Sequence, residues 1–150
     1  MTTIGFNFTS SDIYYVAVSG TLNAPTFIVK NKISLPANFD VPTTVDWFEN
    51  ELAAIINNIN PDQVSYRLTI NNITNKYVQS VYYGQAILNL LCHRQQIGIC
   101  HTSPGSVKPG KFNQPKETNL KKYVDNVLGT HPPHWNNNMR NSALVALLQL

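Results

Sequence analysis

In this 150-residue sequence, a first candidate metal site is a pair of histidines, His131 and His134. They lie three residues apart in the segment His-Pro-Pro-His-Trp, and imidazole is a common ligand of zinc. The two prolines between them exclude a helix that would bring both rings to one face. We therefore expect an ordinary loop. The alternative is a hydrolase that uses His101, His131 and His134 together.

Two cysteine–histidine pairs, Cys92-His93 and Cys100-His101, are a second candidate site. A thiol beside an imidazole can act as a nucleophile, and the same atoms can hold a metal. The first pair is predicted to end a helix, whereas the second is predicted to lie in or beside a strand, which does not favour a shared site. We expect both cysteines to be small buried residues without a disulfide.

A lysine-rich segment over residues 104–122 is the third candidate. Residues 1–89 hold four Lys or Arg and six Asp or Glu, a net charge of −2, whereas residues 90–150 hold seven and two, a net charge of +5. This asymmetry is typical of a surface that faces a polyanion, although a solvated face that keeps a protein soluble has the same composition. The candidate phosphate contacts are Lys108, Lys111, Lys116, Lys121 and Lys122.

The elements that must position these side chains follow from the spacing of apolar residues. Stretches rich in Ile, Val, Tyr and Phe, separated by turn residues, predict five strands, over residues 4–8, 13–18, 27–35, 64–70 and 97–101. Apolar residues at helical spacing predict four helices, from a cap at Thr43 or Thr44 to Pro61, and over 77–93, 116–128 and 138–148. Residues 71–75 are predicted to form a loop. Gly84, inside a helix, predicts a close packing contact there.

The predicted order β-β-β-α-β-α-β-α-α favours a single α/β domain over residues 1–150. Its sheet would be mixed and five-stranded, with helices on both faces and with sites at the strand ends. No stretch approaches the ~18 apolar residues that a membrane span needs. The first residues carry no basic, apolar leader, so we expect a cytoplasmic protein with no membrane partner.

Five short segments, in the correct order, resemble those of the RuvC-type Holliday junction resolvases of the RNase H-like superfamily. They are residues 4–7, 61–67, 84–88, 104–108 and 138–144. The order and spacing of these segments carry the resemblance, which spans nearly the whole chain; an uncharacterised bacterial branch of the superfamily is similar in the same way. The resemblance implies an RNase H-like fold, DNA contacts by the Pro-x-x-Val-Lys segment, and a metal site at the ends of the first and fourth strands.

All four catalytic acids that the resemblance implies are absent. Asn7 stands in place of the first aspartate, Arg67 in place of the glutamate, and Asn138 and Asn141 in place of the last pair. Two-metal hydrolysis needs carboxylates to offset two divalent ions ~3.5–4 Å apart. A guanidinium ~4 Å from such an ion is repelled by about 8 kcal/mol at an effective dielectric constant of ~20. We therefore expect no metal, no other cofactor and no cleavage by this mechanism.

Three functions follow as hypotheses. In the first, a catalytically inactive domain binds nucleic acid, branched DNA included, through the basic segment and Arg67. The side-chain carbonyls of the three asparagines would accept hydrogen bonds from Arg67. In a simpler alternative, Arg67 only fills a disused cleft. In the second, the fold is an interaction module in which exposed Tyr and Trp residues bind a protein partner, a homodimer included. In the third, an active nuclease uses the histidine set.

Overall fold

The computed structural model of the protein describes residues 1–69 and 76–150, and in residues 76–78 only the backbone. The predicted loop over 71–75 and the last residue of the predicted fourth strand, Ile70, lie outside the described residues. Among those that are described, no helix has both the length and the apolar character of a membrane span.

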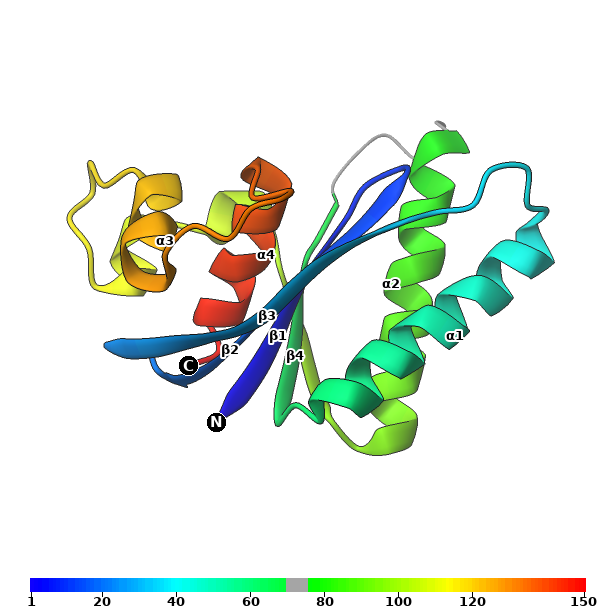
Figure 1. The fold of residues 1–150 in the computed structure, drawn as a ribbon, viewed down its shortest axis with the longest axis horizontal. Helices are drawn as coiled ribbons and strands as arrows, with labels where there is room; N and C mark the ends of the chain where they lie inside the picture. The colour runs from blue at the N-terminus through cyan, green and yellow to red at the C-terminus, as the bar shows by residue number, and fades with distance from the viewer. Residues whose placement is uncertain (70–75) are drawn as a thin grey trace.

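Five strands form one mixed sheet in the order β3-β2-β1-β4-β5 (Figure 1). The first three, β1 (Thr2–Phe8), β2 (Asp12–Thr21) and β3 (Ala24–Ser34), form an antiparallel meander. The other two, β4 (Gln63–Arg67) and β5 (Gly98–Thr102), run parallel to β1. The mixed five-stranded sheet is confirmed, although β4 ends three residues earlier than predicted.

Two helices cover each face of the sheet, as predicted. In Figure 1, α1 (Val41–Ile59) and α2 (Lys76–Gln95) lie on one side, and α3 (Leu120–Leu128) and α4 (Asn137–Leu147) lie on the other. Two short 3-10 turns, η1 (Pro104–Ser106) and η2 (Pro109–Phe112), connect β5 to α3.

Two helix starts differ from the prediction because other residues cap them. The Asp40 carboxylate accepts a hydrogen bond from the Thr43 backbone N–H at 2.9 Å, so α1 begins before Thr43 and not at it. The Asn119 side chain accepts from the backbone N–H groups of Lys121 and Lys122, so α3 begins four residues later than predicted. The shorter α3 starts with Lys121 and Lys122 in its first turn.

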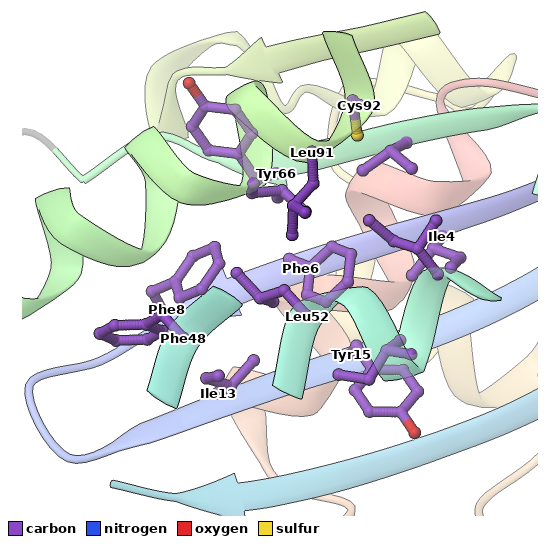
Figure 2. Packing of buried hydrophobic residues seen from close by; sticks show 14 of the residues in the cluster. Ile4, Phe6, Phe8, Ile13, Tyr15, Phe48, Leu52, Tyr66, Leu91 and Cys92 are labelled. Atoms are coloured by element: carbon purple, nitrogen blue, oxygen red, sulfur yellow. The ribbon is translucent and has the colours of Figure 1, made fainter. Parts of the chain in front are cut away.

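The face of the sheet under α1 and α2 carries the larger aromatic core. Because side chains alternate along a strand, Ile4, Phe6 and Phe8 of β1 all point to this face, where they pack with Phe48 of α1 and other buried apolar residues (Figure 2). A Cβ atom added to Gly84 of α2 would lie 2.8 Å from the Phe8 ring, which confirms the predicted close contact.

On the opposite face, α4 lies directly against the backbone of β1. A Cβ atom added to Gly5 would overlap the Ser142 carbonyl oxygen and would lie 2.6 Å from the Ala146 backbone nitrogen. The hydroxyls of Thr3 and Ser65, which flank Gly5 on this face, donate to backbone carbonyls of α4 at 3.0 and 2.7 Å. These contacts fix α4 over the ends of β1 and β4.

One carboxylate, Asp125, ties α3 to α4. Its two oxygens accept hydrogen bonds from Nε and a terminal nitrogen of Arg140, at 2.8 and 2.9 Å. The indole nitrogen of Trp135 donates to the same carboxylate at 2.7 Å. The Arg140 hydrogen bond, chiefly, holds the pKa of Asp125 below its usual range. The second half of α3 is therefore held beside α4.

Candidate functional site

The ends of β1 and β4 bring Asn7 and Arg67 to the same face of the sheet. Gly5 and Ser65 are paired across these two parallel strands, and both face α4. Asn7 and Arg67 each follow two residues later, so their side chains point to the α4 face as well. The strand ends therefore place both residues beneath the first turns of α4.

The other two positions, Asn138 and Asn141, lie three residues apart on α4 and so share one side of that helix. The Asn7 amide, which is 3% exposed, donates to the Asn138 side-chain oxygen at 3.2 Å. Asn141 lines a pocket together with Arg67. The structure thus gathers all four positions where the resemblance implies acids at one strand-end site.

The pocket at this site has a volume of about 150 Å³. Its walls come from the end of β4, from the segment around η1, from the start of α3 and from α4. The lining residues are Arg67, Pro104, Val107, Leu120, Lys121, Asn141 and Leu144.

Lys121 is the side chain that joins α3 to this site. Its ammonium group donates to the Asn141 side-chain oxygen and to the Asn137 carbonyl oxygen. Burial lowers the pKa of Lys121 to about 8, and the positive charges of Arg67 and Arg140 contribute to the same shift. Sequence reasoning named Lys121 only as one lysine of a basic segment. The Asn119 cap, which is a recognisable signal, sets the start of α3, but the path of the preceding loop, which carries Lys121 to the pocket, is not visible in the sequence.

The Arg67 guanidinium is half-buried, and burial lowers its pKa from the ordinary value. Within the described part of the chain, its side chain has no hydrogen-bond or ion-pair partner. The expected ring of asparagine carbonyls around Arg67 is not what the structure has, because Asn138 accepts from Asn7 and Asn141 accepts from Lys121. As far as the described residues go, a cation therefore faces the pocket with its donors free.

The residues at this site do not fit the pair of divalent cations that the fold implies. Two cationic side chains and neutral amides surround it, and none of the described residues that line the pocket is a carboxylate. Over residues 1–69 and 76–150, no three His, Cys, Asp or Glu side chains come close enough to hold a metal ion. Amide oxygens alone cannot offset two divalent charges, so we derive no step through a metal.

The remaining candidate lysines are exposed, and they do not all gather at one place. Lys108 and Lys116 line a second, open hollow of about 560 Å³ together with Pro109, Gly110 and Gln114. Lys111 and Lys122 line neither this hollow nor the pocket of Arg67. The basic segment thus contributes Lys108 and Lys116 to the open hollow and Lys121 to the pocket, while Lys111 and Lys122 lie elsewhere on its surface.

The histidine set does not assemble. The His131 ring stacks on Phe27 of β3, with 3.6 Å between ring centroids, and its Nε2 lies 2.7 Å from the Leu128 carbonyl oxygen. His101 belongs to β5, at the opposite edge of the sheet. His131 therefore packs a loop, as the simpler interpretation of the His-Pro-Pro-His segment expects.

Both cysteines are free, and the expected burial is confirmed for Cys92 but not for Cys100, which is only partly buried. Burial raises the pKa of Cys92 to about 11, and burial also raises the pKa of Cys100. Both side chains are therefore thiols and not nucleophilic thiolates at neutral pH.

The tyrosines and tryptophans expected to anchor a protein partner are not exposed in the part of the chain that the structure describes. Tyr14, Tyr15, Tyr66 and Tyr123 are buried in the two cores, and Trp135 is bound to Asp125. The exposed large apolar side chains are instead Met1, Ile28, Phe39, Val41 and Leu90. Helices cover both faces of the sheet, so the strand tyrosines are buried whichever face they point to. Trp47, Tyr82 and Tyr83 are partly exposed, and the interaction module stays a prediction.

Solved structures that are similar to this chain include Holliday junction resolvases, whereas no protein-family model and no curated protein matches it. The RuvC of Thermus thermophilus, solved in complex with a Holliday junction substrate, has a TM-score of 0.79 and 12% identity, over 99% of this chain and 91% of that one. The yeast mitochondrial Holliday junction resolvase has a TM-score of 0.75 and 13% identity, over 97% and 76%.

A viral enzyme extends the same likeness. The Holliday junction resolvase of fowlpox virus has a TM-score of 0.61 and 12% identity, over 98% of this chain and 96% of that one. At such low identities the likeness establishes the fold. The protein has a RuvC-like, RNase H-like fold, with Asn7, Arg67, Asn138 and Asn141 at its strand-end site.

Proposed function

We propose that the protein binds nucleic acid at the strand-end pocket, with Arg67 and Lys121 as phosphate contacts, and that it does not cleave by a two-metal mechanism. The observation that carries the proposal is the presence of two cationic side chains in one pocket, with no carboxylate among the described residues that line it. A disused cleft filled by Arg67 alone would not need a second cation.

The electrostatics of the pocket favour an anion. The depressed pKa of Lys121 reflects burial and repulsion from Arg67 and Arg140. Of these two arginines, Arg140 already has a carboxylate partner. A phosphate between Arg67 and Lys121 would relieve the repulsion, and the first turn of α3 adds the positive end of a helix dipole.

The open hollow between Lys108 and Lys116 supports a more extended contact. It lies on the chain segment that leads from β5 to α3, so the same segment serves the hollow and the pocket. Contacts of lysine with backbone phosphates give affinity and orientation but carry no base sequence. The likeness to proteins solved with Holliday junctions makes branched DNA the first substrate to test.

The test is a titration of labelled duplex and four-way-junction DNA at rising salt. We expect binding at ~50 mM salt that weakens steeply by ~200 mM, with a logarithmic slope of about −0.9 for each phosphate neutralised. Arg67→Gln and Lys121→Gln should each weaken binding and reduce the slope. Arg94→Gln is the matched control, because Arg94 is an exposed cation on α2, across the sheet from the pocket.

Failure to bind any DNA at ~50 mM salt, where such contacts are strongest, would sink the proposal. A metal-dependent cleavage activity in the natural protein would contradict the second part of the proposal, provided that Arg94→Gln retains this activity and Lys121→Gln loses it.

A second candidate function is a protein-interaction module, which a partly apolar hollow on another face favours. This hollow, of about 540 Å³, lies between β3 and α1, where Ile28, Val29, Ile33, Ile55 and Ile59 line it together with the polar residues Thr2, Glu51 and Asn58. Since Ile28 is 44% exposed, a second copy of the chain could cover it. Sedimentation velocity over a range of protein concentrations, without DNA, would reveal such a dimer.

A further inference from the structure

We propose that the pocket of Arg67 and Lys121 recognises a terminal phosphate monoester, at the end of a nucleic-acid strand, in preference to a bridging phosphodiester. This inference rests on the proposed binding of nucleic acid and specifies the chemical group that enters the pocket. Three features of the pocket support it: its charge, its free donors and its shape.

The charge of the pocket matches a dianion better than a monoanion. Arg67 and Lys121 are the charged residues of the lining, and no acid accompanies them. A terminal phosphate monoester carries a charge of about −1.5 to −2 at pH 7. A bridging phosphodiester carries a single negative charge, so it would leave one of the two cations uncompensated.

The free donors match the number of phosphate oxygens. A guanidinium has five N–H donors, and within the described residues none of those of Arg67 is taken. The Lys121 ammonium uses donors on Asn141 and Asn137 and keeps another for a ligand. A monoester presents three terminal oxygens, of which two can bind Arg67 in a bidentate manner and the third can accept from Lys121.

The shape of the pocket favours the end of a strand. Its volume of about 150 Å³ is small beside the 560 Å³ of the open hollow at Lys108 and Lys116. Apolar side chains complete its wall, namely Pro104, Val107, Leu120 and Leu144. A continuous backbone must enter and leave a site, for which the larger hollow has room, whereas the smaller pocket has room for a single terminal group.

The experiment compares one nicked DNA duplex in three forms, with a 5′-phosphate, with a 3′-phosphate and with hydroxyls on both sides of the nick. We expect the natural protein to bind at least one phosphorylated form about tenfold more tightly than the hydroxyl form, as one additional charge-assisted contact predicts. The 5′ and 3′ forms identify which end supplies the phosphate. Thymidine 5′- and 3′-monophosphate should compete with the preferred form, and thymidine should not.

The variants locate the preference. Lys121→Gln and Arg67→Gln should reduce it to less than about twofold, whereas Lys122→Gln should weaken all three forms equally, because Lys122 is exposed and outside the pocket. Should Arg67→Gln fail to fold, as judged by circular dichroism, Arg67→Lys provides the test. It keeps the charge and loses the bidentate contact, so the preference should shrink.

The outcomes separate this inference from the proposed function. Equal affinity for all three forms, with binding intact, overturns the terminal-phosphate site and leaves nucleic-acid binding standing. A preference that survives in both Lys121→Gln and Arg67→Lys places the recognition elsewhere and also overturns the site. Absence of binding to every form overturns both proposals.

Discussion

Lys121 stands near two arginines, Arg67 and Arg140, and only Arg140 has a carboxylate beside it. An amide oxygen and a backbone carbonyl accept from the ammonium, but neither carries a formal charge. Half-burial and like charge together make the protonated lysine less stable in the folded protein than in the unfolded chain. The residue thus opposes folding at neutral pH while it prepares the pocket for an anion.

This opposition predicts a dependence of stability on pH. The pKa of Lys121 is about 8 in the folded protein, against an ordinary value of 10.5, so between these pH values the unfolded chain binds more protons. The free energy of unfolding therefore rises, through this group, as pH increases from about 8 to 10.5. In Lys121→Gln that rise is missing.

The measurement is urea unfolding of both proteins at pH 7 and at pH 10. Between these pH values, the stability of the natural protein relative to Lys121→Gln should increase by on the order of 1 kcal/mol, discounted for the solvent that screens a half-buried group. Parallel pH profiles for the two proteins would show that Lys121 carries no depressed pKa.

The sequence alone was enough to select the four candidate site positions, because they lie in short segments that follow the same order as those of the resolvases. These positions are Asn7, Arg67, Asn138 and Asn141. The sequence was not enough to place Lys121. That position depends on the path of residues 104–119, which is fixed by burial of Phe112 against Tyr123, with 5.4 Å between the ring centroids. Such a tertiary contact leaves no periodic signal in a loop.

At the scale of elements, α4 is held by a backbone-to-backbone approach that permits only glycine at position 5. The atoms that an added Cβ would meet are the carbonyl oxygen of Ser142 and the backbone nitrogen of Ala146. Neither can move unless the helix moves. The position of Asn138 and Asn141 therefore depends on the absence of a single methyl group.

We predict that Gly5→Ala destabilises the protein by about 3 kcal/mol, at the upper end of the usual cost of overpacking a core. Gly105→Ala is the matched control, since a Cβ there has open space and should change stability by less than about 0.5 kcal/mol. Gly84→Ala should lie between them, because the Phe8 ring can rotate and alanine favours a helix by ~1 kcal/mol.

Thermal and urea unfolding of the three variants would measure this order. A Gly5→Ala protein as stable as Gly105→Ala would mean that α4 does not press on β1. A pocket that depends on this packing should also change, so DNA affinity should fall in Gly5→Ala and stay unchanged in Gly105→Ala.

The strands and helices were predictable from apolar spacing because each element buries one side. Their limits were less so. Asp40 caps α1 although no apolar repeat marks it, and β4 ends at Arg67 although Leu68 continues the apolar run. Local hydrogen bonds and the arrival of α4, which a single sequence does not display, decide these limits.

At the scale of the whole molecule, the two faces of the sheet differ in kind. Large aromatic residues fill the face under α1 and α2, whereas glycine and hydroxyl side chains let α4 lie directly on the other. The strand ends on the second face carry amides and cations where a metal-dependent nuclease would need acids. The fold of a resolvase therefore frames a site of opposite charge.

The positive charge of the strand-end site can be changed to a negative one by substitution. The change Asn7→Asp, Arg67→Glu, Asn138→Asp and Asn141→Asp removes one positive charge and adds four negative ones at the site. We predict that Mn²⁺ then stabilises the variant by mass action, by about 2.7 kcal/mol at a hundred times its dissociation constant. The natural protein should show no comparable rise in melting temperature.

Arg67→Glu alone is the control, because one carboxylate should not hold two divalent ions. Equal stabilisation of the natural protein by Mn²⁺ would mean that its amides and carbonyls do form a metal site. If Mn²⁺ does not stabilise the variant with all four substitutions, these positions are not the equivalents of the catalytic acids of the resolvases.

The close packing of α4 on β1 also has a consequence for folding during synthesis, because β1 is made long before α4. The hydroxyl of Thr3 finds its acceptor, the Ala146 carbonyl, 143 residues later, and a ribosome that adds ~5–20 residues per second needs roughly 7–30 s to make that stretch. Until then Tyr14, Val16 and Val18 of β2 lack the helix that buries them. A nascent chain therefore exposes one apolar face of its sheet to chaperones and to other nascent chains. The emergence of α4 completes both the cover of that face and the pocket of Arg67 and Lys121.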